Sequence, residues 1–459
     1  MNLKLVPFAA MAAIMATSCS KEEVMDINYD PDGKAITFTA GVGHSRAVET
    51  TINNLGDFAV YSKVVHPEGV LYDSFLIGAD GENGAEIAHK NTSSSNSWEL
   101  DRKVYLPLSG ADVVFWAYTD NTPVTGDVKT PLSYGKVTFD NNKGPQINGY
   151  KINKCDLTAT DRTIWADGNS QKDLVCAFAQ TTKKNVIDLN FNHVLSQISI
   201  NAIQKDKAGN DSRIVKVKGA WIVNANGTGN LSAGYAYDKD TNTAKENNEW
   251  TLSGTESFGS YFSSAIELSS DNASDLLSSS LMLMPQQLNE WNGKDITTNN
   301  AYILLLCRVE LKHPGATHDG ADLSDIGVDG TNHYHQQFPV STDGKYHAEE
   351  YGFSCVPLKS TWSMGKKYSY NLDICGASSG AGVYPPNIPT TTDAVKAYIN
   401  KLIPSSETEG DNTKIKVVTN RPDGKKVGDP VLEEPIKFNV TVSDWANAGS
   451  EWTDGNVNL

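Results

Sequence analysis

The sequence is poor in the motifs that mark nucleotide-dependent and metal-dependent enzymes. It has neither a GxGxxG turn nor a GxxxxGK[ST] loop, so the usual phosphate-binding turns are excluded. It contains no CxxC pair and no Cys/His spacing typical of a zinc site. Amphipathic helical patterns are scarce, which argues against a parallel α/β layout. We expect no catalytic residue, no metal and no cofactor.

Positive charge is also in short supply. The 39 Lys and Arg residues are outnumbered by 55 Asp and Glu residues, which gives a net charge of -16. A protein that neutralises phosphates needs a basic face, so neither nucleic acid nor an anionic membrane is an expected partner.

Cysteines are few, and beyond Cys19 they are Cys155, Cys176, Cys307, Cys355 and Cys375. Most of these five lie in apolar runs, which favours burial as small apolar side chains. A bridge between Cys155 and Cys176 stays open as an alternative in an oxidising compartment.

The N-terminus is typical of an export signal. Lys4 precedes an apolar run from Leu5 to Met15, which is too short to span a bilayer. Small residues follow, and then Cys19, in a pattern that resembles a bacterial lipobox. That resemblance implies that residues 1–18 are a signal peptide and that Cys19 becomes lipidated. The next four residues, SKEE, resemble the signal that sends Bacteroides-type lipoproteins to the outer face of the outer membrane.

Alternation of apolar and polar residues recurs over most of the chain, which is typical of half-buried strands. Gly, Asn, Ser and Asp are frequent between these segments and indicate turns. The pattern predicts an all-β protein built from antiparallel β-sandwiches. A boundary is expected near Lys184, and the best helical pattern covers 392–402. The segments expected as strands include 35–42, 103–108, 112–118, 186–200, 215–223, 301–311, 366–374 and 436–442.

Several of these segments together resemble the fimbrillins, the type V pilin family of Bacteroides-type bacteria. The matching stretches include WELDRKVYLPLSGADVVFWAY, FNHVLSQISI, VPLKSTWSMGKKYSYNL and PIKFNVTVSDW, in that order. The resemblance implies two tandem transthyretin-like antiparallel β-sandwich domains, at 30–184 and 185–459.

The resemblance also implies processing by an arginine-specific protease. The matching place is GVGHSRAVETT, where a cut between Arg46 and Ala47 would remove a propeptide of residues 19–46 that contains the first strand. A protease needs an accessible, extended connector, which the small residues here favour. An ordinary surface arginine in a loop is the alternative.

Removal of the first strand would leave an apolar groove and two unpaired sheet edges, which accept another strand. One face of that strand carries Ile36, Phe38, Ala40 and Val42. A candidate donor with the same alternation carries Ile436, Phe438, Val440 and Val442. The same pattern equally describes the last core strand of the C-terminal domain. KIKVV at 414–418 could supply a second donor.

Two other features suggest binding sites. A loop rich in Asp and His, at 318–335, could hold a hard cation, although its spacing is not that of an EF-hand and a solvated loop is the simpler interpretation. His193 is expected to be structural. Trp98, Trp250, Trp291 and Trp452 lie in polar contexts, and exposed rings there would favour glycan binding.

The sequence therefore predicts a structural and adhesive fimbrial subunit that is not an enzyme. It would be anchored by lipid in the outer membrane, exposed at the cell surface, and assembled with other fimbrial subunits into a homo- or hetero-polymer by protease-triggered donor-strand exchange. A monomeric surface lipoprotein that binds glycans is the alternative. A tail beyond residue 445 departs from the usual shaft subunit, so shaft, tip and anchor roles stay open.

Overall fold

The structure is a computed structural model. It describes residues 33–42, 50–66, 69–93, 96–125, 130–205, 212–238, 243–317, 322–376, 378–409 and 414–445, together with the backbone of residues 455–457. The described residues form an all-β protein with two short α-helices, as the sequence predicts. The finer description as two tandem transthyretin-like domains stays a prediction.

The N-terminal sheet has eight strands in the order β3-β2-β4-β5-β1-β11-β10-β6. Its strands are β1 (Thr37–Val42), β2 (Phe58–Val65), β3 (Leu71–Ile77), β4 (Glu86–Lys90), β5 (Trp98–Leu100), β6 (Val113–Thr119), β10 (Val175–Thr181) and β11 (Val186–His193). Strand β2 also pairs with β6, so the ladder of hydrogen bonds returns to its start and the sheet closes into a ring. A closed ring leaves few unpaired edges.

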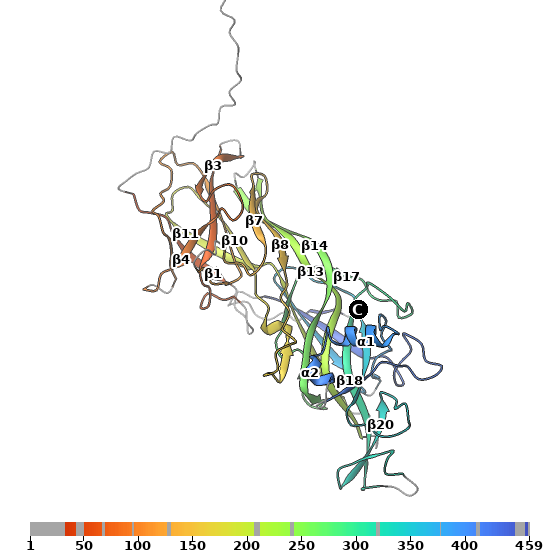
Figure 1. The fold of residues 1–459 in the computed structure, drawn as a ribbon. Coiled ribbons are helices and arrows are strands. Elements are labelled where there is room, and N and C mark those ends of the chain that lie inside the picture. The colour runs from red at the N-terminus through yellow and green to blue at the C-terminus, as the bar shows by residue number, and fades with distance from the viewer. Residues whose placement is uncertain are drawn as a thin grey trace, which may run out of the picture.

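The middle of the molecule is organised by one long hairpin. Its two strands, of 27 and 25 residues, run antiparallel along the molecule (Figure 1). They are the backbone of a ten-stranded sheet. That sheet contains β7 (Lys136–Asp140), β8 (Gly144–Lys151), β9 (Ile164–Ala166), β13 (Ser212–Asp238), β14 (Thr243–Glu267), β18 (Tyr302–Pro314), β19 (Gly327–Val328), β20 (Asn332–Phe338), β21 (Glu350–Pro357) and β24 (Lys416–Val418).

A six-stranded sheet covers the other side of the C-terminal part. Its path is β15-β12-β23-β25-β26, with β16 paired to β12. The strands are β12 (Ser196–Ile203), β15 (Ser274–Asp275), β16 (Leu281–Leu283), β23 (Lys366–Asp373), β25 (Lys437–Asp444) and β26 (Gly455–Val457). The remaining elements are the pair β17 (Gln287–Leu288) and β22 (Ser360–Thr361), a 3-10 turn (Asp167–Asn169), and helices α1 (Thr392–Ile399) and α2 (Ser405–Thr408).

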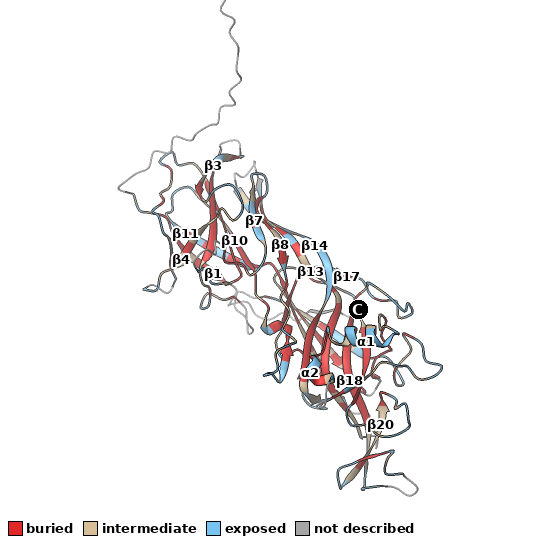
Figure 2. Ribbon diagram, in the orientation of Figure 1, coloured by how far each residue is buried: buried red, intermediate tan, exposed pale blue. Residues whose placement is uncertain are grey.

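The apolar side chains of the described residues form three clusters, one of which is shared by the three large sheets. One cluster of buried side chains runs from Tyr61 and Trp116 in the N-terminal sheet to Tyr370 and Val440 in the six-stranded sheet. A second cluster fills the inside of the N-terminal ring. Figure 2 shows both as buried strands along the length of the molecule. The two ends are therefore joined by packed side chains.

Two expected strands differ in the structure. The segment 186–200 is two strands, because the chain leaves the ladder at Val194 and Leu195. The amide of Val194 there donates to the carbonyl of Leu174. Residues 103–108 form no strand, and Pro107 within them has no N–H to donate. Alternation alone does not reveal such breaks, because apolar and polar residues alternate on both sides of them.

The sequence position near Lys184 does not separate the strands of one sheet from those of another. Strand β11 lies after Lys184 in sequence but pairs with β1 and β10 in the N-terminal sheet. Strands β8 and β9 lie before Lys184 but pair with β13 and β14. The chain therefore changes sheet after β6, after β9 and again between β11 and β12, so the two halves of the chain exchange strands.

The long hairpin tolerates no side chain at Gly259. A Cβ added there would lie 2.0 Å from the carbonyl oxygen of Ala220 and 2.6 Å from the Cα of Trp221. We expect Gly259→Ala to force the backbones of β13 and β14 apart and to lower the free energy of unfolding by about 1–3 kcal/mol. A thermal melt followed by circular dichroism checks this.

Gly56→Ala is the matched control, since a Cβ there meets only the Asn121 side chain at 3.6 Å. It should leave the melting temperature unchanged or slightly raised, because alanine has the smaller backbone entropy in the unfolded chain. Equal melting temperatures for both variants would contradict the close approach at Gly259.

Candidate functional site

The first strand lies inside the N-terminal sheet. It runs parallel to β11 and pairs with it at every residue from Thr37 to Val42. On its other side it shares one ladder pair with β5, in which Phe38 faces Trp98. The amide of Ala40 on that side donates to the Asn96 side chain at 3.0 Å. Strand β1 is thus fully paired along one edge and sparsely paired along the other.

The alternation predicted for this strand is present in its burial. The side chains expected on the buried face are 0–8% exposed, and they are Ile36, Phe38, Ala40 and Val42. The Phe38 ring packs edge-on against Phe58 and Phe115, with centroids 6.0 and 6.1 Å away. Burial of such side chains stabilises a fold by roughly 1.5–3 kcal/mol each for the large ones. The N-terminal core therefore depends on this strand.

The expected processing and lipidation residues lie outside the described residues. This applies to Cys19, Arg46 and Ala47. The chain is described again from Thr50, whose amide donates to Asp173 Oδ2 at 2.8 Å and whose hydroxyl donates to the Asp173 carbonyl at 3.2 Å. The connector that contains Arg46 and Ala47 is thus held at both ends, by β1 and by Asp173.

The candidate donor strand lies within the C-terminal sheet of its own chain. Strand β25 pairs antiparallel with β23 over all eight residues and with β26 over three. Ile436 and Val440 are 5% and 3% exposed, while Phe438 and Val442 are half-buried against the same cluster. The structure thus shows this segment as the last long core strand, and whether it is donated stays a proposal. The second candidate donor forms β24, which pairs with β21.

The end of β25 contacts the end of β11. Trp445 stacks on His193, with ring centroids 4.0 Å apart and planes 10° apart. His193 Nδ1 in turn lies 2.8 Å from Asp173 Oδ2, and both side chains are buried. The contacts of His193 are those of a structural histidine, and they join Thr50, β11 and β25 through Asp173.

The tryptophans offer no exposed platform for sugars among the described residues. Trp98 and Trp291, expected in polar surroundings, are 0% and 1% exposed, because partners distant in sequence cover them. Trp250 is half-buried and donates to the Val194 carbonyl at 2.8 Å. Trp452 lies outside the described residues. An exposed tryptophan platform, the feature that would favour the glycan-binding alternative, is therefore not found within the described residues.

The loop rich in Asp and His is ordered by its own hydrogen bonds where it is described. Asp329 accepts from the Tyr334 hydroxyl and from the amides of Thr331 and Asn332, which hold the pKa of this carboxyl well below its usual range. In the described part of the chain no group of three or more His, Cys, Asp or Glu side chains could hold a metal ion. His318 and Asp319 lie outside it.

The described cysteines are all free thiols. Cys176, Cys307, Cys355 and Cys375 are buried and Cys155 is half-buried. Burial raises the pKa of the Cys307 thiol to about 12, so this group is protonated and unreactive at neutral pH.

Sequence reasoning overlooked one match to the hydrolase pattern GxSxG, at 376–380. The pattern needs a nucleophile turn between a strand and a helix. Here β23 precedes it and the nucleophile position is Ser378, which is exposed in a turn, but among the described residues no helix begins until α1 at Thr392. The local structure is therefore not that of a nucleophile turn.

A buried charge network was also missed, although charged residues within the apolar run 301–311 gave a signal. Arg308 and Glu310 are each 1% exposed on β18, with Nε and Oε1 2.6 Å apart. Glu310 also accepts from Lys216 Nζ at 2.8 Å and from the Tyr346 hydroxyl at 2.6 Å. The guanidinium lies over the Tyr346 ring. Every charge in this group has an opposite charge beside it.

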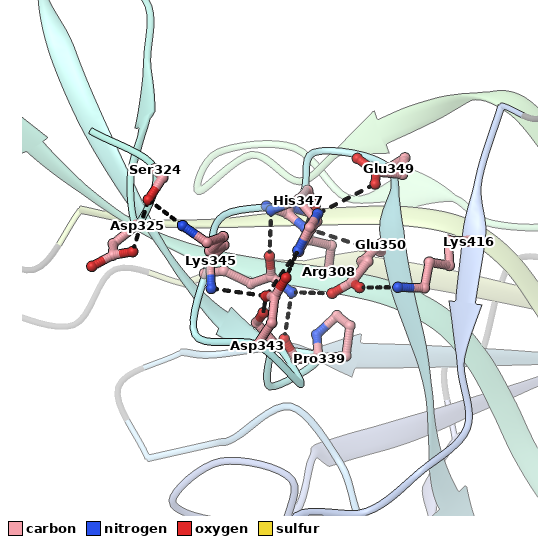
Figure 3. Close-up of polar contacts among 12 residues, drawn as sticks. Arg308, Ser324, Asp325, Pro339, Asp343, Lys345, His347, Glu349, Glu350 and Lys416 are labelled. Atoms are coloured by element: carbon pink, nitrogen blue, oxygen red, sulfur yellow. Dashed lines mark hydrogen bonds and ion pairs between the residues drawn. The ribbon is translucent and has the colours of Figure 1, made fainter. Parts of the chain in front are cut away.

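The network continues to the edge of the ten-stranded sheet. Glu350 on β21 is fully buried and accepts from Lys416 Nζ of β24 at 2.9 Å. Arg308 donates to the backbone carbonyls of His347 and Glu350, and His347 contacts Asp343 at 3.0 Å (Figure 3). These contacts bind the loop before β21, and β24 beyond it, to the centre of the sheet.

Replacing Glu310 tests this network. Burial alone would raise the pKa of the Glu310 carboxyl. Hydrogen bonds from Lys216 and Tyr346 and the positive charge of Arg308 outweigh that effect, so the pKa of Glu310 lies below its usual value. Because the pKa of Glu310 is lower in the folded than in the unfolded protein, its ionisation stabilises the folded state. This contribution is fully present above the unfolded-state pKa of about 4.3 and is lost as the pH falls through the folded-state pKa. We expect Glu310→Gln to reduce the free energy of unfolding by about 3–5 kcal/mol at pH 7.

Urea denaturation at pH 7 and at pH 3 measures the free energy of unfolding of the unmodified protein and of Glu310→Gln. The difference between these two free energies should be smaller at pH 3. Glu82→Gln is the control, since its pair with Lys136 lies at the surface, where the two side chains are 50% and 69% exposed. The control should cost less than about 1 kcal/mol. A difference in free energy of unfolding that is the same at both pH values would contradict an ionised pair of Arg308 and Glu310.

Three comparisons place the chain among known proteins. The sequence model of a family described as fimbrillin-like matches residues 73–383. No curated protein matches the sequence significantly.

No helix among the described residues is both long enough and apolar enough to cross a membrane.

Solved structures with likeness to the chain come from Bacteroides and Parabacteroides species. A fimbrial protein from Bacteroides vulgatus is 18% identical, with a TM-score of 0.41, over 74% of this chain and 95% of that one. A candidate cell adhesion protein from Bacteroides eggerthii is 12% identical, with a TM-score of 0.35, over 92% and 98%. Another from Parabacteroides distasonis is 9% identical, with a TM-score of 0.39, over 91% and 98%.

The family model decides the identity of the chain, because these structural likenesses are distant. It spans well over half of the 459 residues, from within β3 to Val383, which lies between β23 and α1. The protein belongs to the fimbrillin-like family.

Proposed function

We propose that the protein is a fimbrial subunit that is exported as a surface lipoprotein and assembled by donor-strand exchange after a cut following Arg46. Membership of the fimbrillin-like family supports a structural or adhesive subunit at the cell surface rather than an enzyme. Lipidation at Cys19, anchoring in the outer membrane and the arginine-specific protease are parts of the proposal that rest on the sequence.

The observation that carries the proposal is the position of β1. This strand comes from the N-terminal segment of the chain, yet it lies inside a closed ring between β5 and β11. A cut after Arg46 would separate it from the rest of the chain, leaving it held only by noncovalent contacts. The vacated place would expose the apolar residues around Phe58 and Phe115 and one edge of β11. Such a place accepts a strand with the same alternation.

Strand β25 has the features required of the donor. Its apolar residues recur at every second position from Ile436 to Val442, like those of β1 from Ile36 to Val42. It is near the C-terminal end of the described residues and only three ladder pairs join its outer edge to β26. To be donated, β25 must separate from β23. The proposal therefore requires that the free energy gained by pairing in the neighbour's groove exceeds the free energy lost when the β23–β25 hydrogen bonds break. Strand β24 is a shorter second candidate.

Processing is the first step to test. Purified unlipidated precursor (residues 20–459) is digested with an arginine-specific protease, and the product is run unheated on a denaturing gel. We expect one early cut that exposes Ala47 as the new N-terminus, followed by a ladder of heat-sensitive multimers. The multimers should form because the apolar groove is open only after β1 is released.

Arg46→Ala is the control and should remain uncut at this position and monomeric. Cutting without multimers would contradict self-assembly and indicate a subunit that does not polymerise with itself. Resistance at Arg46 in the unmodified chain would overturn the proposed processing.

The donor strand is tested separately. Phe438→Asp places a charge on the apolar face of β25, where the native side chain is half-buried, so we expect cleavage as before but at least a tenfold loss of multimers. Asn439→Asp is the matched control, because this neighbour is exposed and points to the other face. Gel densitometry after protease treatment gives the multimer fraction.

Circular dichroism of both variants before cleavage shows whether the monomer is folded. Multimers that persist in a folded Phe438→Asp variant would exclude β25 as the donor and move the assignment to β24.

A further inference from the structure

A trough runs along β24 at the edge of the ten-stranded sheet. One hollow of about 550 Å3 lies between β24 and α1, lined by Val395, Ile399, Ile415 and Val417. A second, of about 680 Å3, adjoins it through Val395 and continues past Ile388 to the turn at 422–425. A smaller hollow extends the second toward Phe353 and Tyr384. We call these together the β24 trough.

The trough lies beside a sheet edge. Strand β24 pairs in parallel with β21, and within the described residues no strand pairs with its other side. An edge strand next to an apolar channel is the arrangement that proteins use to take up an extended peptide, because the backbone supplies hydrogen bonds and the channel receives alternate side chains. The ligand expected here is therefore an extended strand with an apolar face.

The charge of the trough favours an acidic strand. Between residues 414 and 426 there are five basic residues and one acidic residue. Lys414 is paired with Glu407 and Lys416 with Glu350, so three basic residues and one acid remain, a net charge of +2 in a chain whose total is -16. The Arg421 guanidinium lines two of the hollows, and it makes no hydrogen bond or ion pair with the described residues. Lys425 lines the second hollow beside it. Of the lining acids, Glu409 is paired with Lys396 at 3.3 Å and Glu349 lies 3.5 Å from His347 Nδ1, while Asp423 lines the second hollow.

One segment of this chain has the required pattern. Residues 22–32 read EEVMDINYDPD and carry a net charge of -5. From Met25 to Asp32 apolar residues alternate with polar ones, since Met25, Ile27, Tyr29 and Pro31 are separated by acids and one asparagine. In an extended strand these four would share one face and the acids the other. This segment lies outside the described residues.

We propose that the β24 trough receives residues 22–32 of a second copy of this chain as an added strand. The contact is between copies, because residue 33 directly follows the segment and leads into β1, while α1, which borders the trough, lies on the other side of the long hairpin from β1 (Figure 1). A cut after Arg46 would remove the segment together with β1. The contact therefore joins uncut precursors, and it does not depend on donor-strand exchange.

A synthetic fluorescent peptide of residues 22–32 tests the proposal by anisotropy, titrated with the purified precursor (residues 20–459). We expect saturable binding that weakens with added salt. The double variant Arg421→Glu, Lys425→Glu should weaken it at least tenfold, because the rim then repels the acids. Val395→Trp, which fills the trough at the junction of the two hollows, should weaken it similarly. Melting temperatures of both variants confirm that they are folded.

The matched control is Lys103→Glu, Lys359→Glu, which makes the same charge change at exposed residues outside the trough and should alter the dissociation constant less than twofold. A peptide with Met25, Ile27 and Tyr29 replaced by serine should bind at least tenfold more weakly. Equal binding of that peptide would overturn strand insertion and leave charge attraction alone. Absence of saturable binding, or equal binding by Val395→Trp, would overturn the trough as the site.

Discussion

The N-terminal half of the molecule depends on a single hydrogen-bonded ladder, the one between β1 and β11. Without β1, the ring of strands opens between β5 and β11, and the aromatic side chains packed on Phe38 face water. Six residues therefore complete both the backbone pairing and the packing of this end. Only the connector at 43–49 joins them covalently to the residues that follow, which include every other strand of this sheet.

The rest of the fold connects this ring to the other end of the molecule. The hairpin of β13 and β14 runs alongside both parts, and β8 bonds to it from the N-terminal half. The buried Asp173 gathers Thr50 and His193, and Trp445 stacks on the histidine. The beginning of the chain after the connector, the partner strand of β1 and the end of β25 therefore meet at one point. Thr50, β11 and the end of β25 are therefore in contact with one another through Asp173 and His193.

Much of the local structure could be predicted from the sequence, but the pairing of the strands could not. Alternation identified the buried faces of β1 and β25, because a strand places every second side chain on one face. It did not show that β11 joins the N-terminal sheet and β12 another, since both halves of 186–200 alternate alike. Trp98 was expected near solvent because its sequence neighbours are polar, but its cover comes from distant strands. The buried partners of Arg308 are likewise distant in sequence.

The direction of β1 has a mechanical consequence. Because β1 and β11 run parallel, a force that pulls the start of one strand away from the end of the other slides the two along each other. All the hydrogen bonds of the ladder are then loaded together, whereas a hairpin pulled open from its free end loses them one at a time. The bonds of a parallel ladder are evenly spaced along its length. The joint between β1 and β11 is thus shaped to resist tension along the strand axis.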